Sequence, residues 1–302
     1  MTSGMSHPAL VAALRHPRAY PWCPSTVELI ETHVSWVFLA GDYVVKIKRP
    51  VAYDFVDHTT LAARHQSCLD EVRLNRRLTT NVYLDAAPIV HDGAAYRVNG
   101  TGTPVEWATL MRRLPADRML DAMIAAETAP PDVADRLADR LIPFHRDLAP
   151  FRGMPPAESA GRLATVLTDN LDELRPFAGS LVAPAQLALI DTSMRDFLDR
   201  NRELLAQRVA DGWIREGHGD LRAEHICVEP DGQLQIFDCI EFNVALRRAD
   251  VASDIAFLLM DLSRLGAGTA ASALAARYRA AGIDLPPPLL NVYRAHRALV
   301  RA

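Results

Sequence analysis

The stretch His218–Phe242 reads HGDLRAEHICVEPDGQLQIFDCIEF, and it decides how the rest of the chain is interpreted. Two apolar runs, His225–Val228 and Leu234–Phe237, flank a Pro-Asp-Gly turn, which is the pattern of a β-hairpin. A hairpin brings the residues before its first strand close to those after its second strand. The chemistry carried by these two ends therefore matters most.

Four polar side chains stand at the ends of the two runs: His218, Asp220, His225 and Asp238. Acidic and imidazole groups stabilise an apolar core poorly, whereas they are typical of catalytic and binding sites. We expect the four side chains to converge at one end of the hairpin.

The order of these residues, HGDL followed by a hairpin and then IFDCIEF, resembles the aminoglycoside phosphotransferase family, a branch of the protein-kinase-like fold. The resemblance implies an α+β, bilobal molecule with a small antiparallel-sheet N-lobe and a larger, mainly helical C-lobe that carries the catalytic β-hairpin. It is closest to a subgroup often fused to a C-terminal P-loop kinase-like domain. No G-x-x-x-x-G-K-[ST] run occurs in the chain, so we expect that domain to be absent or to lie beyond its end.

Composition narrows the classes of function. A length of 302 residues with 49% apolar residues suffices for two lobes. The net charge of −4, without a basic block, argues against nucleic acid as a partner, and the absence of a long apolar run argues against a membrane span. Four cysteines without CxxC spacing predict reduced thiols and a cytoplasmic protein: Cys23, Cys68, Cys227 and Cys239.

Lysine usage points to one strand. Of the 33 basic residues only Lys46 and Lys48 are lysines, and both lie in the apolar-basic stretch Val44–Lys48. A compact ammonium group is chemically distinct from the planar fork of arginine, so its retention at one place suggests a specific role. The alternative is chance combined with a solvated strand edge.

Apolar periodicity predicts the elements of the N-lobe, residues 1–114. We expect a loosely helical lead-in over Met1–Pro24, and the Ala40-Gly41-Asp42 turn indicates a hairpin. The hinge is expected near residues 107–115, followed by the catalytic and acceptor-binding lobe, 115–302. The predicted strands are Val27–Thr32, Ser35–Leu39, Tyr43–Lys48, Val82–Val90, Ala94–Val98 and Trp107–Leu114, with a helix over Leu61–Leu78.

The family resemblance implies roles for the lysines and one glutamate. Lys46 would hold the α- and β-phosphates of ATP, and Lys48, on the same face of the strand, is its rival. Glu71 would orient Lys46 as the helix glutamate of kinases does. Alternatively, Glu71 is a surface acid paired with Arg76 or Arg77.

The same resemblance implies where the rest of the nucleotide would lie. No glycine-rich phosphate loop is present, so the turn Thr32–Ser35 would contact phosphates through its N–H groups and the Ser35 hydroxyl, unless it is an ordinary turn. Backbone groups near Met111 and Arg113 would pair with the adenine edge.

The C-lobe is expected to be helical. His145 lies on an apolar stripe and is interpreted as a packing residue, Asp250 as an N-cap, and Asp254 as either a second cap or an anchor of the catalytic loop. The predicted helices are Val133–Leu148, Ser159–Leu174, Pro184–Val209, Asp250–Leu265 and Leu289–Ala302.

By resemblance, Asp220 would be the catalytic base and Asp238 the Mg²⁺ ligand. His225 stands where the family has an Asn, and it would contact metal (Mg²⁺ or a softer ion such as Mn²⁺), bind phosphate or stabilise the loop. His218 would lock the loop. Arg222 would meet the γ-phosphate or the substrate, or is simply an exposed arginine.

Three functions follow. The first is a kinase that moves the γ-phosphate of ATP to a hydroxyl of a small molecule such as a sugar or amino sugar. The second is an ATP-binding pseudokinase, and the third is a metallohydrolase built on the two histidines and two aspartates, which would leave the paired lysines unexplained. Arg247 and Arg248 hint at a neutral or anionic acceptor.

Overall fold

The computed structural model describes residues 7–180 and 182–301 and divides into two compact units. The first, which we call the sheet unit, comprises the chain up to Arg118 together with Cys227–Asn243. The second, the helical unit, comprises Met119–Ile226 and the chain from Val244 onward. The domain boundary between residues 114 and 115 stays a prediction.

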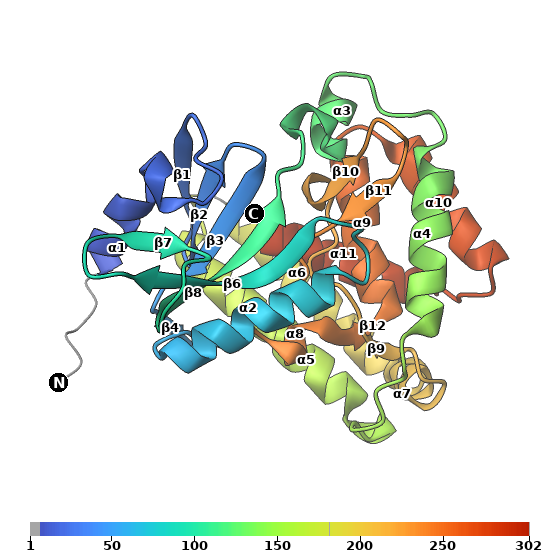
Figure 1. Cartoon of the computed structure of the whole chain (residues 1–302). Coiled ribbons are helices and arrows are strands. Elements are labelled where there is room, and N and C mark those ends of the chain that lie inside the picture. The colour runs from blue at the N-terminus through green and yellow to red at the C-terminus, as the bar shows by residue number, and fades with distance from the viewer. Residues whose placement is uncertain (1–6, 181, 302) are drawn as a thin grey trace. The chain divides into compact units, whose positions relative to one another are not determined.

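The sheet unit is built on six antiparallel strands in the order β1-β2-β3-β8-β6-β7 (Figure 1). Its strands and helices, with the helical unit described below, confirm the predicted α+β class. The elements are α1 (His7–Leu14), η1 (Pro17–Ala19), β1 (Val27–Glu31), β2 (Ser35–Ala40), β3 (Tyr43–Lys48), β4 (Ala52–Tyr53), β5 (Val56–Asp57), α2 (Leu61–Asn75), β6 (Tyr83–His91), β7 (Tyr96–Val98), β8 (Pro104–Arg112) and η2 (Ala116–Arg118).

Strand β3 lies inside this sheet, between β2 and β8, and carries both lysines. The hairpin that joins it to β2 turns at Gly41, whose φ of 66° favours a residue without a Cβ. In the register, Lys46 stands opposite Val37 on β2 and Thr109 on β8. Because opposite residues share a face, the lysines and Thr109 point to the same side.

The two faces of the sheet differ in chemistry. On one face Phe38, Val45 and Leu110 form a cross-strand apolar row that packs with Leu10 and Leu14 of α1. Helix α2 crosses the sheet and contacts β8 and β6 (Figure 1). The buried charged residues of α2 find partners in the sheet: Glu71 pairs with Lys46, and Arg64 pairs with Glu106.

The predicted catalytic hairpin forms as β10 (Ile226–Val228) and β11 (Leu234–Ile236). The first strand starts one residue later than predicted because His225 ends a 3-10 turn, η5 (Ala223–His225). The Ile236 N–H donates to the Leu78 carbonyl, and Gln235 accepts from the Thr80 N–H. The second strand is thus fastened to the segment that follows α2.

The helical unit is organised around α9, which has 12 of its 14 residues buried and packs against α10 and α11. Asp250 caps α9 by accepting from the Ala252 N–H at 2.8 Å, as predicted. The elements are α3 (Leu120–Ala125), α4 (Val133–Asp147), η3 (Pro156–Glu158), α5 (Ser159–Leu174), η4 (Arg175–Phe177), α6 (Pro184–Arg200), α7 (Arg202–Ala210), β9 (Ile214–Glu216), α8 (Val244–Arg247), β12 (Arg248–Asp250), α9 (Val251–Arg264), α10 (Gly268–Ala280) and α11 (Pro287–Arg301).

Several element predictions were wrong in detail. The single helix predicted over Pro184–Val209 is two helices, because the backbone leaves the helical region at Asn201, with φ of −121° and ψ of 21°. Helix α2, predicted to run to Leu78, ends at Asn75. Helix α10 was not predicted, since its alanine-rich sequence lacks a clear apolar stripe. Met1–Ser6 of the lead-in and Ala302 of the last helix lie outside the described residues.

Candidate active site

A cluster of buried charges on the lysine face of β3 is the centre of the sheet unit's candidate site. Lys46 Nζ donates to Asp238 Oδ1 at 2.8 Å and lies 2.7 Å from Glu71 Oε1. Lys48 Nζ lies 2.8 Å from Glu71 Oε2 and donates to Glu241. The Thr109 hydroxyl also donates to Glu71, at 2.6 Å. Glu71 is therefore a carboxylate shared by both lysines.

Electrostatic interactions keep Glu71 and the two lysines of this cluster charged. Burial would raise the pKa of Glu71, but Lys46 and Lys48 outweigh it and hold that pKa at about 2. Burial would lower the pKa of Lys46, yet the carboxylates of Asp238 and Glu71 raise it well above its ordinary value. At neutral pH Glu71 and the two lysines are thus ionised groups in contact, whereas burial, opposed by Lys48, raises the pKa of Glu241.

The two lysines differ in exposure. The Lys46 side chain is 15% exposed, whereas that of Lys48 is fully buried, as is that of Glu71. A phosphate group needs a cation that it can reach. Lys46 meets this condition, and Lys48 is placed as an internal partner of Glu71 and Glu241.

Asp238 follows β11 directly after Phe237 and adopts a left-handed backbone with φ of 62°. Its N–H donates to the Tyr83 hydroxyl, and the next N–H, of Cys239, donates to the Asn75 side chain. These bonds stabilise a conformation that a non-glycine residue adopts at a cost, as residues at functional sites often do. The Asp238 side chain remains 41% exposed.

The other residues predicted to touch the nucleotide are held by the sheet itself. Ser35 begins β2 with its side chain buried, and its N–H donates to the Thr32 hydroxyl, so it helps build the turn. Met111 pairs with Val44, and the Arg113 N–H donates to the Asp42 carbonyl. Their contacts with phosphate and adenine stay predictions.

In the helical unit, the loop that carries His218 and Asp220 is held by Asp254. The N–H groups of His218 and Gly219 donate to its two carboxylate oxygens at 2.6 and 2.8 Å. Gly217 fits closely, since a Cβ there would lie 2.3 Å from Asp254 Oδ2. These bonds favour the interpretation of Asp254 as an anchor of the loop. The cap of α9 is provided by Asp250, four residues earlier.

Asp220 and its neighbours form a compact polar group. Arg222 lies 2.9 Å from Asp220 Oδ2 and also pairs with Glu224, and it is 22% exposed. His225 Nδ1 is 2.9 Å from the Asp220 carbonyl, and its Nε2 is 3.3 Å from Arg222. His218 Nδ1 accepts from the Asp220 N–H at 3.3 Å. Both histidines therefore shape the loop around Asp220.

The structure gathers the predicted residues into two sets. Lys46, Lys48, Glu71 and Asp238 lie together in the sheet unit, and His218, Asp220, Arg222 and His225 lie together in the helical unit. Convergence of Asp238 with the other three hairpin residues stays a prediction.

Three supporting residues had weak or no sequence signals. Thr109 is one polar residue in an apolar strand. Asp261 accepts the Ala223 N–H at 3.0 Å and so anchors η5, and Tyr278 meets His145 at 2.8 Å. His145 in turn lies 3.3 Å from Asp254. A buried acid in an apolar helix was the only signal available for Asp261.

We expect Asp254→Asn to destabilise the protein by about 2–4 kcal/mol, because one buried loop N–H loses a charged acceptor and the His145 ring loses its hydrogen bond to a carboxylate oxygen. Contacts with His145 and His218 outweigh burial and hold the pKa of Asp254 well below its ordinary value of 3.8. Its stabilisation is then complete above that value and is lost as the pH falls below it. Urea unfolding of both proteins at pH 7 and pH 3 should show a difference that shrinks at pH 3, and an unchanged difference would contradict the role.

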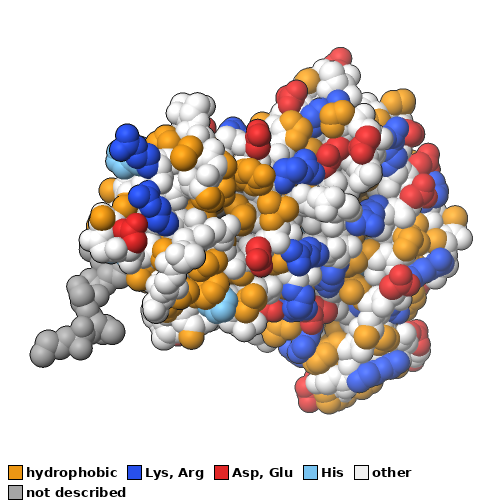
Figure 2. All heavy atoms as spheres, viewed as in Figure 1, with side chains coloured by type: hydrophobic (Ala, Val, Ile, Leu, Met, Phe, Trp, Pro, Cys, Tyr) orange, Lys and Arg blue, Asp and Glu red, His pale blue; other side chains and the backbone are white. Residues whose placement is uncertain are grey.

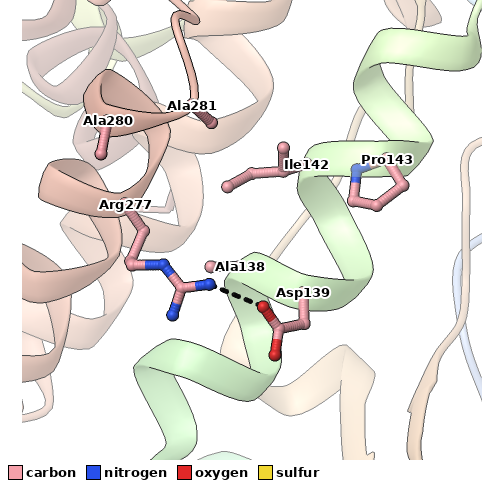
Figure 3. Close-up of a pocket in the computed structure, with 7 residues that line it drawn as sticks. All are labelled: Ala138, Asp139, Ile142, Pro143, Arg277, Ala280 and Ala281. Carbon is pink, nitrogen blue, oxygen red and sulfur yellow. Dashed lines mark hydrogen bonds and ion pairs between the residues drawn. The ribbon is translucent and has the colours of Figure 1, made fainter.

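A second hollow in the helical unit offers no candidate site. A hollow of about 350 Å³ lies between α4 and α10, where Arg277 bonds Asp139 at 2.7 Å (Figure 3). Because Arg277 is paired there and with Asp135, we assign the hollow no catalytic role.

On the face shown in Figure 2, basic and acidic side chains are intermingled over the helical unit. Within residues 7–180 and 182–301, no helix is long and apolar enough to cross a membrane.

The chain was compared with family models, with curated protein sequences and with solved structures. No family model matches the chain. It is 34% identical over 277 residues to uncharacterized proteins of Mycobacterium tuberculosis and Mycobacterium bovis, which covers 91% of the chain and 54% of each relative. The chain therefore spans about half the length of these curated relatives.

Among solved structures, a choline/ethanolamine kinase family protein of Mesorhizobium loti matches with a TM-score of 0.49 and 15% identity, over 96% of this chain and 83% of that one. The Plasmodium vivax ethanolamine kinase gives 0.45 and 11%, over 90% and 73%. An aminoglycoside phosphotransferase of Alicyclobacillus acidocaldarius gives 0.43 and 16%, over 100% and 88%.

Proposed function

We propose that the chain is an ATP-dependent phosphotransferase that moves the γ-phosphate of ATP to a hydroxyl group of a small molecule. The observation that carries the proposal is the position of Lys46, an ammonium group held between Glu71 and the partly exposed Asp238. Phosphoryl transfer needs mainly fixed charges and positioned groups, and this arrangement supplies both signs of charge side by side.

In the sheet unit, Lys46 would neutralise charge on the phosphates while Glu71 keeps its ammonium group in place. Lys48 is buried and would act indirectly by holding Glu71. The turn that ends at Ser35 would face the phosphates, and the segment around Met111 and Arg113 would read the adenine edge.

Asp238 fits a magnesium ion by the chemistry of its donor atoms. Mg²⁺ is commonly held by one or two carboxylates together with substrate phosphates, and does not require a cage of protein ligands. No group of three or more His, Cys, Asp or Glu residues suited to a metal occurs in the described part of the chain. When bound, the ion would neutralise charge that develops on the transferred phosphoryl group. His225, with its ring nitrogens directed at Asp220 and Arg222, suits loop stabilisation better than metal binding.

In the helical unit, Asp220 would accept the proton of the acceptor hydroxyl or orient that hydroxyl for attack. Its carboxylate is 24% exposed, so a substrate can reach it. Arg222 lies against it and His218 bonds its N–H, so both fix its direction. We place the protein in the cytoplasm, where reduced cysteines persist, and note that none of the four is in a disulfide.

The test is Mg²⁺-dependent consumption of ATP in the presence of pooled sugars, amino sugars, polyols, hydroxy acids and aminoglycosides. We expect turnover with one pool, loss of it in Asp220→Ala, and ATP binding that is retained in this variant. Failure of the wild-type protein to bind ATP would contradict the proposal.

A pseudokinase is the second candidate, and the observation that favours it is His225 at the position where the family has an Asn ligand. This candidate predicts ATP binding without consumption in every pool. Replacing the residue with the family's own, His225→Asn, distinguishes the two, because transfer that appears only in this variant would identify a site that has lost its metal ligand.

A further inference from the structure

A cavity of about 210 Å³ lies within the helical unit, apart from the hollow between α4 and α10. Its walls come from α5, α7, β9, α8, β12, α9 and α11. Most of the lining is apolar, with leucine, valine and isoleucine side chains such as Leu163, Leu205 and Ile214. Such a cavity suits the body of a small organic molecule.

The charged groups of this cavity are mainly basic. Its one acid is Asp250, and both oxygens of Asp250 accept from Arg208, at 2.6 and 2.8 Å. The exposed Arg162, with Arg248 and Arg297, adds positive charge to the lining. An ammonium group in this cavity would find arginines and a carboxylate already neutralised, so a cation is disfavoured.

Two polar atoms in the lining have no hydrogen-bond partner among the residues that the structure describes. They are Nδ1 of His296, a side chain that is 94% buried, and Nε of Arg297, both without solvent contact. Burial, reinforced by Arg297, lowers the pKa of His296 to about 3, so the ring is neutral at pH 7. Burial also lowers the pKa of Arg297, despite the opposing effect of Asp254 and Asp220. A buried N–H without an acceptor is costly, so the Arg297 guanidinium is incompletely satisfied, and an anion beside this partly buried side chain would stabilise its charge.

The cavity is connected to the loop that carries the proposed catalytic base. Arg297 donates to the Ser253 hydroxyl at 3.3 Å, and Ser253, also in the lining, precedes the loop anchor Asp254. Asp254 and Asp220 are the carboxylates that act electrostatically on Arg297. A molecule seated on Arg297 would therefore lie near the Asp220 loop.

We propose that this cavity is the acceptor site and that it takes an organic anion, a carboxylate or phosphate ester with an apolar body, whose anionic group pairs with Arg297. The assignment of the cavity as acceptor site rests on the proposed phosphotransferase function. The preference for anions follows from the cavity alone and can be measured without ATP.

The binding experiment uses three probes with one carbon skeleton: octanoate, octanamide and octylammonium. Calorimetric titration of the full chain without nucleotide should give the tightest binding for octanoate, by at least about tenfold over octylammonium, because a buried charge-assisted pair forms only with the anion. Equal binding of the three, or tighter binding of octylammonium, would overturn the preference.

Two variants locate the effect. Arg297→Gln should bring the dissociation constant of octanoate to that of octanamide, while Arg294→Gln, on the same helix but outside the lining, should leave it unchanged. If Arg297→Gln fails to fold, the exposed Arg162→Gln provides the second variant, with a smaller loss of octanoate affinity expected. A preference that survives both pocket substitutions would overturn the assignment to this cavity.

The transfer experiment separates this inference from the function on which it rests. If ATP is consumed, the acceptor that supports turnover should be an anion, and octanoate should compete with it. Turnover with a cationic acceptor at a KM that Arg297→Gln leaves unchanged would refute the acceptor site while sustaining the kinase. Anion binding without turnover in any pool would instead refute the kinase, and with it the acceptor role of a cavity that still binds anions.

Discussion

Asp220→Asn should lower kcat for phosphoryl transfer by about 10²–10⁴-fold, which is the usual contribution of a positioned general base. The amide keeps the size of the carboxylate but cannot accept a proton. Binding of ATP should stay within about twofold of the wild-type value, because the groups proposed to hold ATP lie in the sheet unit. Steady-state turnover with the acceptor identified in the pooled panel, together with calorimetric titration of ATP, measures both quantities.

The stability of Asp220→Asn must be measured, because a loss of activity could come from unfolding as well as from loss of the base. The Asp220–Arg222 pair is partly exposed, with 24% and 22% of the side chains accessible, so its loss should cost no more than about 1 kcal/mol. A matched control is Asp211→Asn, which changes an exposed acid of the same unit and should leave kcat unchanged. Retention of more than a tenth of wild-type kcat by Asp220→Asn, in a folded protein, would remove Asp220 from the role of base.

Local sequence patterns were sufficient to predict strand β3, which carries the two lysines of the candidate site. The alternation in Tyr43–Lys48 and the turn at Gly41 are properties of a few adjacent residues, and the structure has that strand with the predicted bounds. The ion pair of Lys46 with Glu71, expected from the family resemblance, is present, which rules out the surface role considered for Glu71.

Other features depend on partners far away in the sequence. Nothing near Lys48 indicates that Glu241 neutralises it, and nothing near Arg64 indicates its buried pair with Glu106. The left-handed backbone of Asp238 is stabilised by hydrogen bonds to Tyr83 and, through Cys239, to Asn75. These arrangements arise only when the sheet and α2 are assembled, so no local pattern could predict them.

The second large effect separates the two lysines. Lys46→Met should lower kcat/KM by about 10²–10³-fold, the usual effect of removing one preorganised charge from a transfer site. Its effect on stability should be smaller than that of the same change at Lys48, because Glu71 keeps Lys48 as a partner and Asp238 is 41% exposed to water.

Lys48→Met should instead lower the free energy of unfolding by about 3–5 kcal/mol. It removes a cation from between the fully buried Glu71 and the nearly buried Glu241. Urea unfolding and turnover measured on both variants form the test. Methionine keeps the length and apolar body of lysine in each case, so the comparison isolates the ammonium group. If Lys48→Met stays as stable as the wild type and loses transfer while Lys46→Met retains it, the phosphate-binding lysine is Lys48. The exposure of Lys46 then has no bearing on catalysis, and the family register assumed for β3 is shifted by two residues.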